Sequence, residues 1–171
     1  MNQTEHLSSL QRLLNLLTGF EQHEQDIQDI AQSIQNACAS PDAMGQAYGS
    51  QARTLMEHDP EGALVLAIGY ELDDYLALAD TVDELWEEIQ GAFEARDLPP
   101  FPYDDMPFQD VDGFFEWADT QLLACHPDYG LLEFAQSYDE EFQLILVKRE
   151  HIQEILNLCQ KLGIPAEPCW N

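Results

Sequence analysis

The sequence predicts an α+β protein, in which N-terminal helices are followed by a β-α-α-β-β-α-β unit. Residues 131–134 and 142–147 are two β-rich runs joined by a short polar segment, which is typical of a β-hairpin. Over residues 149–162 the apolar side chains follow helical spacing, and Gly163 is placed to end that helix. We therefore expect a ferredoxin-like, antiparallel or mixed sheet with helices on one face.

The N-terminal part of the chain is predicted to be helical. Leucines recur on one face over residues 4–18, and apolar residues repeat with the same spacing over residues 21–39. Ser40 and Pro41 form a helix-start signal, a capping side chain followed by a proline in the first turn. A third helix is therefore expected to continue through Met56, although its two glycines weaken it.

Residues 60–72 permit two interpretations. Asp59 and Pro60 repeat the helix-start signal, whereas large apolar residues that alternate with small ones would suit a strand. We favour the helix, because the cap and the first-turn proline are the more specific signals. The first strand is then placed at residues 75–79.

The chain before the hairpin is expected to hold two further helices. The first covers residues 82–96 and has a mostly acidic outer face. Residues 98–107 contain four prolines and should form a loop, since proline lacks the amide hydrogen that helices and sheets use. The second helix starts at Asp110 or Asp112, and residues 164–170 form a last extended segment after the hairpin and its helix.

The charge of the chain is its most unusual property. The 171 residues include 33 Asp and Glu against 6 Lys and Arg, a net charge of -27. Such a charge repels phosphates, so direct binding to nucleic acid or to an anionic membrane is not expected. A basic protein, a metal ion or a cationic ligand is an easier partner, and a basic protein is the one we expect.

The length suits one compact domain, in which residues 1–58 form a helical segment on an α+β core of residues 59–171. No signal-peptide pattern and no apolar run of membrane-spanning length is visible, and the cysteines form no CxxC pair. We therefore expect reduced thiols and a cytoplasmic location. The four cysteines are Cys38, Cys125, Cys159 and Cys169.

The most acidic stretch is the candidate binding site. Residues 57–119 hold 19 Asp and Glu against one basic residue, Arg96, and aromatic residues lie among the acids. Carboxylates would steer a basic protein and aromatic rings would anchor it. The alternative is a solvated acidic face whose aromatic residues fold inward as core. The predicted binding residues are Phe101, Tyr103, Asp104, Asp105, Phe108, Asp110, Asp112 and Trp117.

The sequence gives little support to catalysis. Asp73, Asp74 and Asp80 are close together, but no calcium-binding loop surrounds them. Cys125 and His126 are adjacent, without the second pair that zinc sites need. No phosphate-binding glycine loop, nucleophile elbow or HExxH motif is present. We predict no catalytic residues, no metal ligands and no cofactor, and keep a carboxylate enzyme that uses a divalent metal as the alternative.

Lys148 and Arg149 form a basic pair at the end of the second hairpin strand. A basic pair at a helix N-terminus opposes the helix dipole. The pair either neutralises nearby carboxylates or marks an anion contact, and we favour neutralisation.

Two resemblances to known families accompany these patterns. Residues 73–86, 129–132, 142–147 and 162–164 resemble small acidic bacterial proteins that share a domain of unknown function, which implies a fold but no activity. Residues 80–86 and 108–114 are similar to part of the acidic antirestriction proteins that mimic DNA.

The predicted function is therefore that of a non-catalytic acidic binding module. Its partner would be a basic protein, such as a toxin that it neutralises or a nucleic-acid enzyme whose DNA groove it blocks. A structural or regulatory module whose charge serves only solubility is the remaining alternative. The sequence makes no prediction of oligomeric state.

Overall fold

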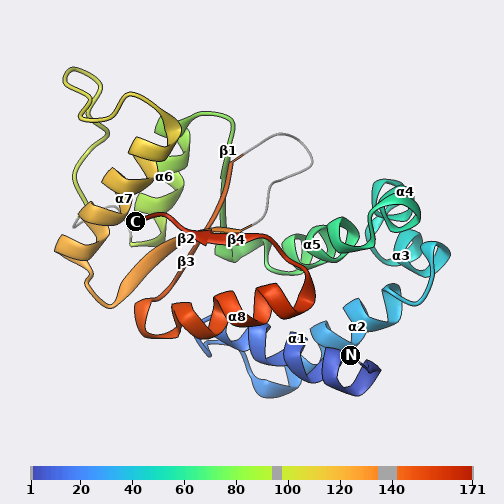
Figure 1. The fold of residues 1–171 in the computed structure, drawn as a ribbon. Helices are drawn as coiled ribbons and strands as arrows, with labels where there is room; N and C mark the ends of the chain where they lie inside the picture. Colours follow the sequence, from blue (N-terminus) through green and yellow to red (C-terminus); the bar gives the residue numbers. More distant parts are fainter. Residues whose placement is uncertain (1, 94–97, 135–141, 171) are drawn as a thin grey trace. The chain divides into compact units, whose positions relative to one another are not determined.

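The computed structural model describes residues 2–93, 98–134 and 142–170 (Figure 1). The helices are α1 (Gln3–Leu17), α2 (Glu24–Ala37), α3 (Pro41–Tyr48), α4 (Ser50–His58), α5 (Pro60–Glu71), α6 (Val82–Ala92), α7 (Val111–Cys125) and α8 (Ile152–Leu162). The strands are β1 (Leu76–Ala79), β2 (Tyr129–Phe134), β3 (Phe142–Lys148) and β4 (Ala166–Pro168), with short 3-10 turns at η1 (Asp73–Tyr75) and η2 (Arg149–His151). The predicted α+β class is confirmed.

The chain divides into two compact units. Unit 1 comprises residues 1–75 and 154–165, and unit 2 comprises residues 76–153 and 166–171. Unit 1 thus holds α1 to α5 and most of α8, while unit 2 holds the sheet, α6 and α7. The predicted boundary lies between residues 58 and 59, whereas unit 1 continues past it to residue 75 and includes α5.

In unit 1, capping side chains and glycines decide where the helices begin and end. Asp59 accepts a hydrogen bond from the Gly62 amide at 3.1 Å, so α5 is a helix as predicted and not a strand. The prediction of a single helix over residues 40–56 is wrong. Gly49 has φ of 101°, a conformation that costs glycine little, and it separates α3 from α4.

In unit 2, the sheet order is β1-β3-β2-β4 and every neighbouring pair is antiparallel. The predicted hairpin of β2 and β3 and the strand β1 are confirmed, whereas the hairpin's polar connection lies outside the described residues. A ferredoxin-like sheet would place the last strand beside β1, but here β4 pairs with β2. The Cys169 amide donates to the Leu131 carbonyl at 3.1 Å, which holds the C-terminal segment at this edge.

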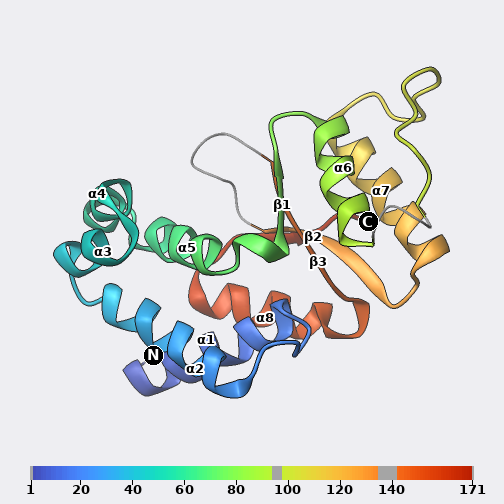
Figure 2. The ribbon, with the colours of Figure 1, turned by 180° about the vertical axis from the view of Figure 1, so that it is seen from behind.

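The helices α6 and α7 cover one face of this sheet. They lie side by side in both views (Figures 1 and 2), with α6 against β1 and α7 against β2. One apolar core joins the two helices to the strands, and its largest fully buried rings are Trp86 on α6 and Phe114 on α7. None of the helices in the described part of the chain is long and apolar enough to cross a membrane.

The cross-strand pair of Glu133 on β2 and Glu167 on β4 places two carboxylates opposite each other. Burial, and then the charges of Glu167 and Asp112, raise the pKa of Glu133. The folded state therefore binds this proton more tightly than the unfolded state, so the ionised carboxylate costs stability at neutral pH. That cost falls as the pH drops through the raised pKa.

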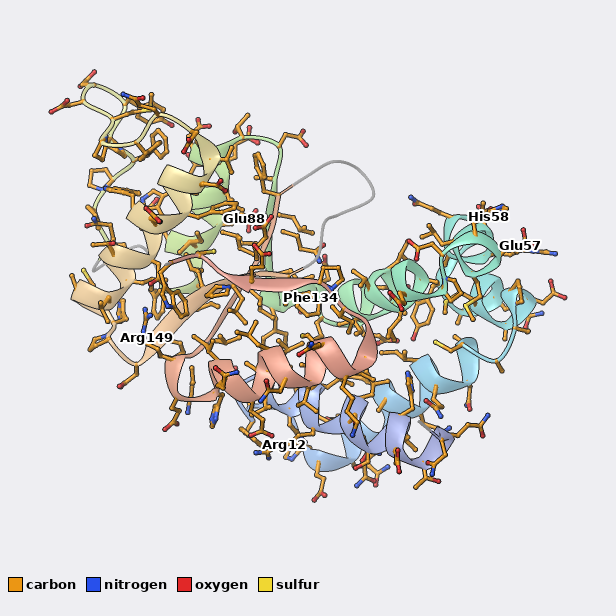
Figure 3. All side chains as sticks on the ribbon, in the orientation of Figure 1. Arg12, Glu57, His58, Glu88, Phe134 and Arg149 are labelled. Atoms are coloured by element: carbon orange, nitrogen blue, oxygen red, sulfur yellow. The ribbon has the colours of Figure 1, made fainter. Side chains whose placement is uncertain are left out.

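We expect Glu133→Gln to stabilise the protein by about 0.5 kcal/mol at neutral pH, because it removes a like-charge cross-strand pair. Urea denaturation followed by circular dichroism measures this gain. The gain should vanish as the pH falls toward about 4, where the unfolded carboxyl also becomes protonated. Glu88→Gln on the exposed side of α6 (labelled in Figure 3) is the control with a smaller expected effect. A gain that is independent of pH would contradict this explanation.

Candidate functional site

The predicted binding residues lie mainly in residues 98–110, a loop that leads into α7 and extends beyond the helices in Figure 1. Three of the predicted aromatic anchors face inward. Phe108 is only 9% exposed, and its ring lies 5.4 Å from that of Phe114. Phe101 and Trp117 are half-buried, with ring centres 6.4 Å apart. These three rings therefore pack in or against the apolar core, as the alternative interpretation of the aromatic residues expected.

Trp86 on α6 attaches this loop to the core. Its side chain is completely buried, and its Nε1 donates to the Pro99 carbonyl at 2.8 Å. The Gln90 Nε2 donates to the same carbonyl at 3.1 Å. The Trp86 ring also lies 4.7 Å from that of Trp117. Pro99 is therefore fixed by hydrogen bonds, and the Trp86 ring that holds it is itself packed in the core.

Tyr103 and Met106, in contrast, face outward at the far end of the loop. Their exposed fractions are 64% and 54%. The Tyr103 hydroxyl donates to the Asp83 carboxylate on α6 at 3.1 Å, and its ring lies 4.8 Å from the Phe101 ring. Tyr103 is thus an exposed aromatic ring held at two points. Met106 was not among the predicted binding residues, although its place between Asp105 and Pro107 in a proline-rich loop indicated exposure.

The Tyr103 side chain lies in a negatively charged environment. Hydrogen bonds from Thr81 and then from Tyr103 lower the pKa of Asp83. The hydrogen bond to Asp83 raises the pKa of Tyr103, and the negative charges of Asp83, Glu87 and Glu84 add to this effect. We call this set the Tyr103 surface: Asp83, Glu84, Glu87, Tyr103, Asp104, Asp105 and Met106. Apart from Asp83, all of these residues are exposed.

The acidic residues of α6 were predicted to lie on an outer face, but their proximity to the loop was not predicted. Asp83, Glu84 and Glu87 lie within one turn of helix, which is visible from spacing. Their proximity to Tyr103 depends on how the loop folds back over α6, and the printed sequence carries no signal for that.

The two remaining predicted acids lie at the start of α7. Asp110 caps this helix, since its carboxylate accepts from the Gly113 amide at 2.7 Å. A side chain at Gly113 would approach both Asp110 and Phe108 to 3.0 Å, so this turn is tightly packed. Asp112 is exposed, and its charge contributes to the raised pKa of Glu133. The structure thus gives Asp110 a role in the fold, while Asp104 and Asp105 are exposed in the loop.

Arg149 (labelled in Figure 3) neutralises a buried carboxylate. Asp119 on α7 is 3% exposed, and the Arg149 Nη2 lies 3.2 Å from each of its carboxylate oxygens. Asp119 also accepts from the Leu131 amide at 3.0 Å, while Arg149 donates to the Tyr129 carbonyl at 2.8 Å. The guanidinium lies 4.8 Å from the centre of the Trp170 ring. The prediction that the basic pair serves neutralisation is confirmed for Arg149.

A cavity of about 440 Å³ lies beside this ion pair. Its lining includes two carboxylates and two cationic side chains, which offset each other in charge. The lining residues are Pro127, Asp128, Tyr129, Lys148, Arg149 and Glu150.

The residues considered for metal binding and nucleophilic catalysis do not form a cluster. Among the described residues, no group of three or more His, Cys, Asp or Glu could hold a metal ion. All four cysteines are free, and Cys125 is exposed. Burial raises the pKa of the Cys159 thiol to about 12, so it is protonated at neutral pH.

Comparisons of this chain with protein-family models, with curated proteins and with solved structures found no match. Its function is therefore inferred from its own residues.

Proposed function

We propose that this protein acts by binding a basic protein through the Tyr103 surface and catalyses no reaction of its own. The observation that carries the proposal is the exposed pair of Tyr103 and Met106, which lies among five carboxylates in a loop fixed to the core. Exposed aromatic and methionine side chains near carboxylates suit the surface of a basic protein. The negative charges steer the partner and the apolar groups anchor it.

The anchoring of the loop also favours binding. Trp86 and Gln90 hold Pro99, and the Asp83 carboxylate holds Tyr103. A surface that is ordered before binding loses less conformational entropy when the partner arrives. We infer that the partner is a basic toxin that the protein neutralises, or a nucleic-acid enzyme whose DNA-binding groove it occupies.

Reversal of Asp104 and Asp105 to lysine together should abolish capture of the partner. Both side chains are exposed and lie at the loop end, so the fold should be retained. The measurement is capture from a source lysate at an ionic strength of about 0.15 M, with a high-salt wash and identification by mass spectrometry. The proposal expects one basic protein, retained in stoichiometric amount by the wild type and absent from the variant.

The matched control reverses Asp26 and Glu57, two exposed carboxylates of unit 1 (Glu57 is labelled in Figure 3). It changes the net charge by the same amount, so a partner that recognises the Tyr103 surface is still captured. Equal loss of the partner by both variants would contradict the proposal. Retention of many different basic proteins that all wash off in salt would also contradict it, because it would show that the charge binds cationic proteins nonspecifically.

A further inference from the structure

We propose that the Tyr103 surface selects arginine over lysine in its partner. This inference rests on the proposed function and adds the chemistry of the recognised side chain. It starts from the Tyr103 ring, which is 64% exposed and is therefore open to a partner. The hydroxyl end of the ring is fixed on Asp83 at 3.1 Å, and the ring packs against Phe101 at 4.8 Å.

An exposed ring with a carboxylate at its hydroxyl end suits a guanidinium group. The planar guanidinium can lie over the ring while its donors, directed outward in the same plane, reach carboxylates at the ring edge. Asp83 already lies at the hydroxyl end of the ring, and Asp104 and Asp105 directly follow Tyr103 in the chain. One acceptor therefore lies at the hydroxyl end of the ring, and two exposed carboxylates are adjacent to it in the chain.

The lysine ammonium fits this arrangement less well. It is a compact and strongly hydrated charge, which gains attraction from the same carboxylates but cannot lie flat on the ring and bond sideways at once. The carboxylates alone would attract arginine and lysine equally, and the aromatic ring accounts for the difference in affinity. The surface does not need to move to receive the guanidinium, because Tyr103 is already held in place.

The same arrangement occurs twice among the described residues. The Arg12 guanidinium lies 5.5 Å from the centre of the Phe20 ring and bonds to the Glu154 carboxylate. The Arg149 guanidinium lies 4.8 Å from the centre of the Trp170 ring and bonds at the same time to the Asp119 carboxylate. The Tyr103 surface offers an exposed ring and nearby carboxylates, and among the described residues no arginine lies over that ring.

The test compares octa-arginine and octa-lysine peptides, which carry equal charge, by fluorescence anisotropy at an ionic strength of about 0.15 M. The wild-type protein should bind the arginine peptide at least about threefold more tightly, given the strength of a cation–π contact at an exposed site. Tyr103→Leu should remove this preference, because it lowers the affinity for the arginine peptide more than the affinity for the lysine peptide. Tyr103→Phe should retain the preference, because it keeps the ring.

The matched control is Tyr70→Leu, which removes a tyrosine with 65% exposure from α5 in unit 1. It should leave the arginine preference intact. Equal affinity of the wild type for both peptides, lost when Asp104 and Asp105 are reversed, would overturn the arginine inference while the proposed function stands. Equal affinity that survives this reversal would overturn both. A preference that Tyr103→Leu does not change would also overturn the inference.

Discussion

Replacement of Trp86 by alanine should destabilise the protein by about 3–5 kcal/mol, the range typical for loss of a buried tryptophan. The side chain is completely buried, and it packs against Phe114 and Trp117. The substitution also removes the Nε1 donor from the Pro99 carbonyl. Urea denaturation followed by circular dichroism would measure the change in the free energy of unfolding.

Two further variants separate the contributions of Trp86. Trp86→Phe keeps an aromatic ring in the core, and Gln90 still donates to Pro99, so we expect a smaller loss of about 1–2 kcal/mol. Leu123→Ala, at an apolar side chain of α7 that is 50% exposed, should stay within about 0.5 kcal/mol. If Trp86→Ala costs no more than Leu123→Ala, Trp86 does not anchor the loop.

Replacement of Asp119 by alanine should have the second large effect. Arg149 is three-quarters buried, at 25% side-chain exposure, and would lose the carboxylate that compensates its charge. The Leu131 amide would lose its acceptor as well. Breaking a buried ion pair from one side typically costs about 3–5 kcal/mol, and the exposed part of Arg149 places our expectation near the lower value. The same denaturation experiment measures it.

A double-mutant cycle with Arg149→Met tests the cause of this loss. Removal of both partners leaves no uncompensated charge, so the double variant should be more stable than the sum of the two single losses predicts. Strict additivity would show that Asp119 stabilises the fold without Arg149. Asp112→Ala, at an exposed position of the same helix, should cost little and serves as the control.

The parts of the fold that depend on local signals could be predicted from the sequence. Asp59 and Pro60 started α5 as expected, and the apolar runs of β2 and β3 pair as a hairpin. The break at Gly49 was missed, because a glycine can continue a helix as well as end one and only the fold determines its φ. The pairing of β4 with β2 was missed because hydrogen bonds between distant segments leave no local pattern.

The candidate site could be predicted only in part for a similar reason. The acidic loop was visible from composition, but composition does not tell which of its aromatic residues are buried and which are exposed. Phe108 is buried while Tyr103 is exposed, and neither spacing nor hydrophobicity separates the two. The contribution of Asp83 depends on a contact across 20 residues of chain. Asp110 was predicted both as a possible helix start and as a binding residue, and the structure confirms that it caps α7.

The most direct test of the Tyr103 surface is an NMR titration of the protein's backbone amides with the octa-arginine peptide at an ionic strength of about 0.15 M. If this surface binds basic partners, the largest shifts should occur at Asp83, Glu84, Glu87 and residues 103–106, and they should saturate together. Shifts of equal size around Asp26 and Glu57 in unit 1 would contradict this, because they would show that the peptide follows the overall charge and that the protein has no dedicated binding surface.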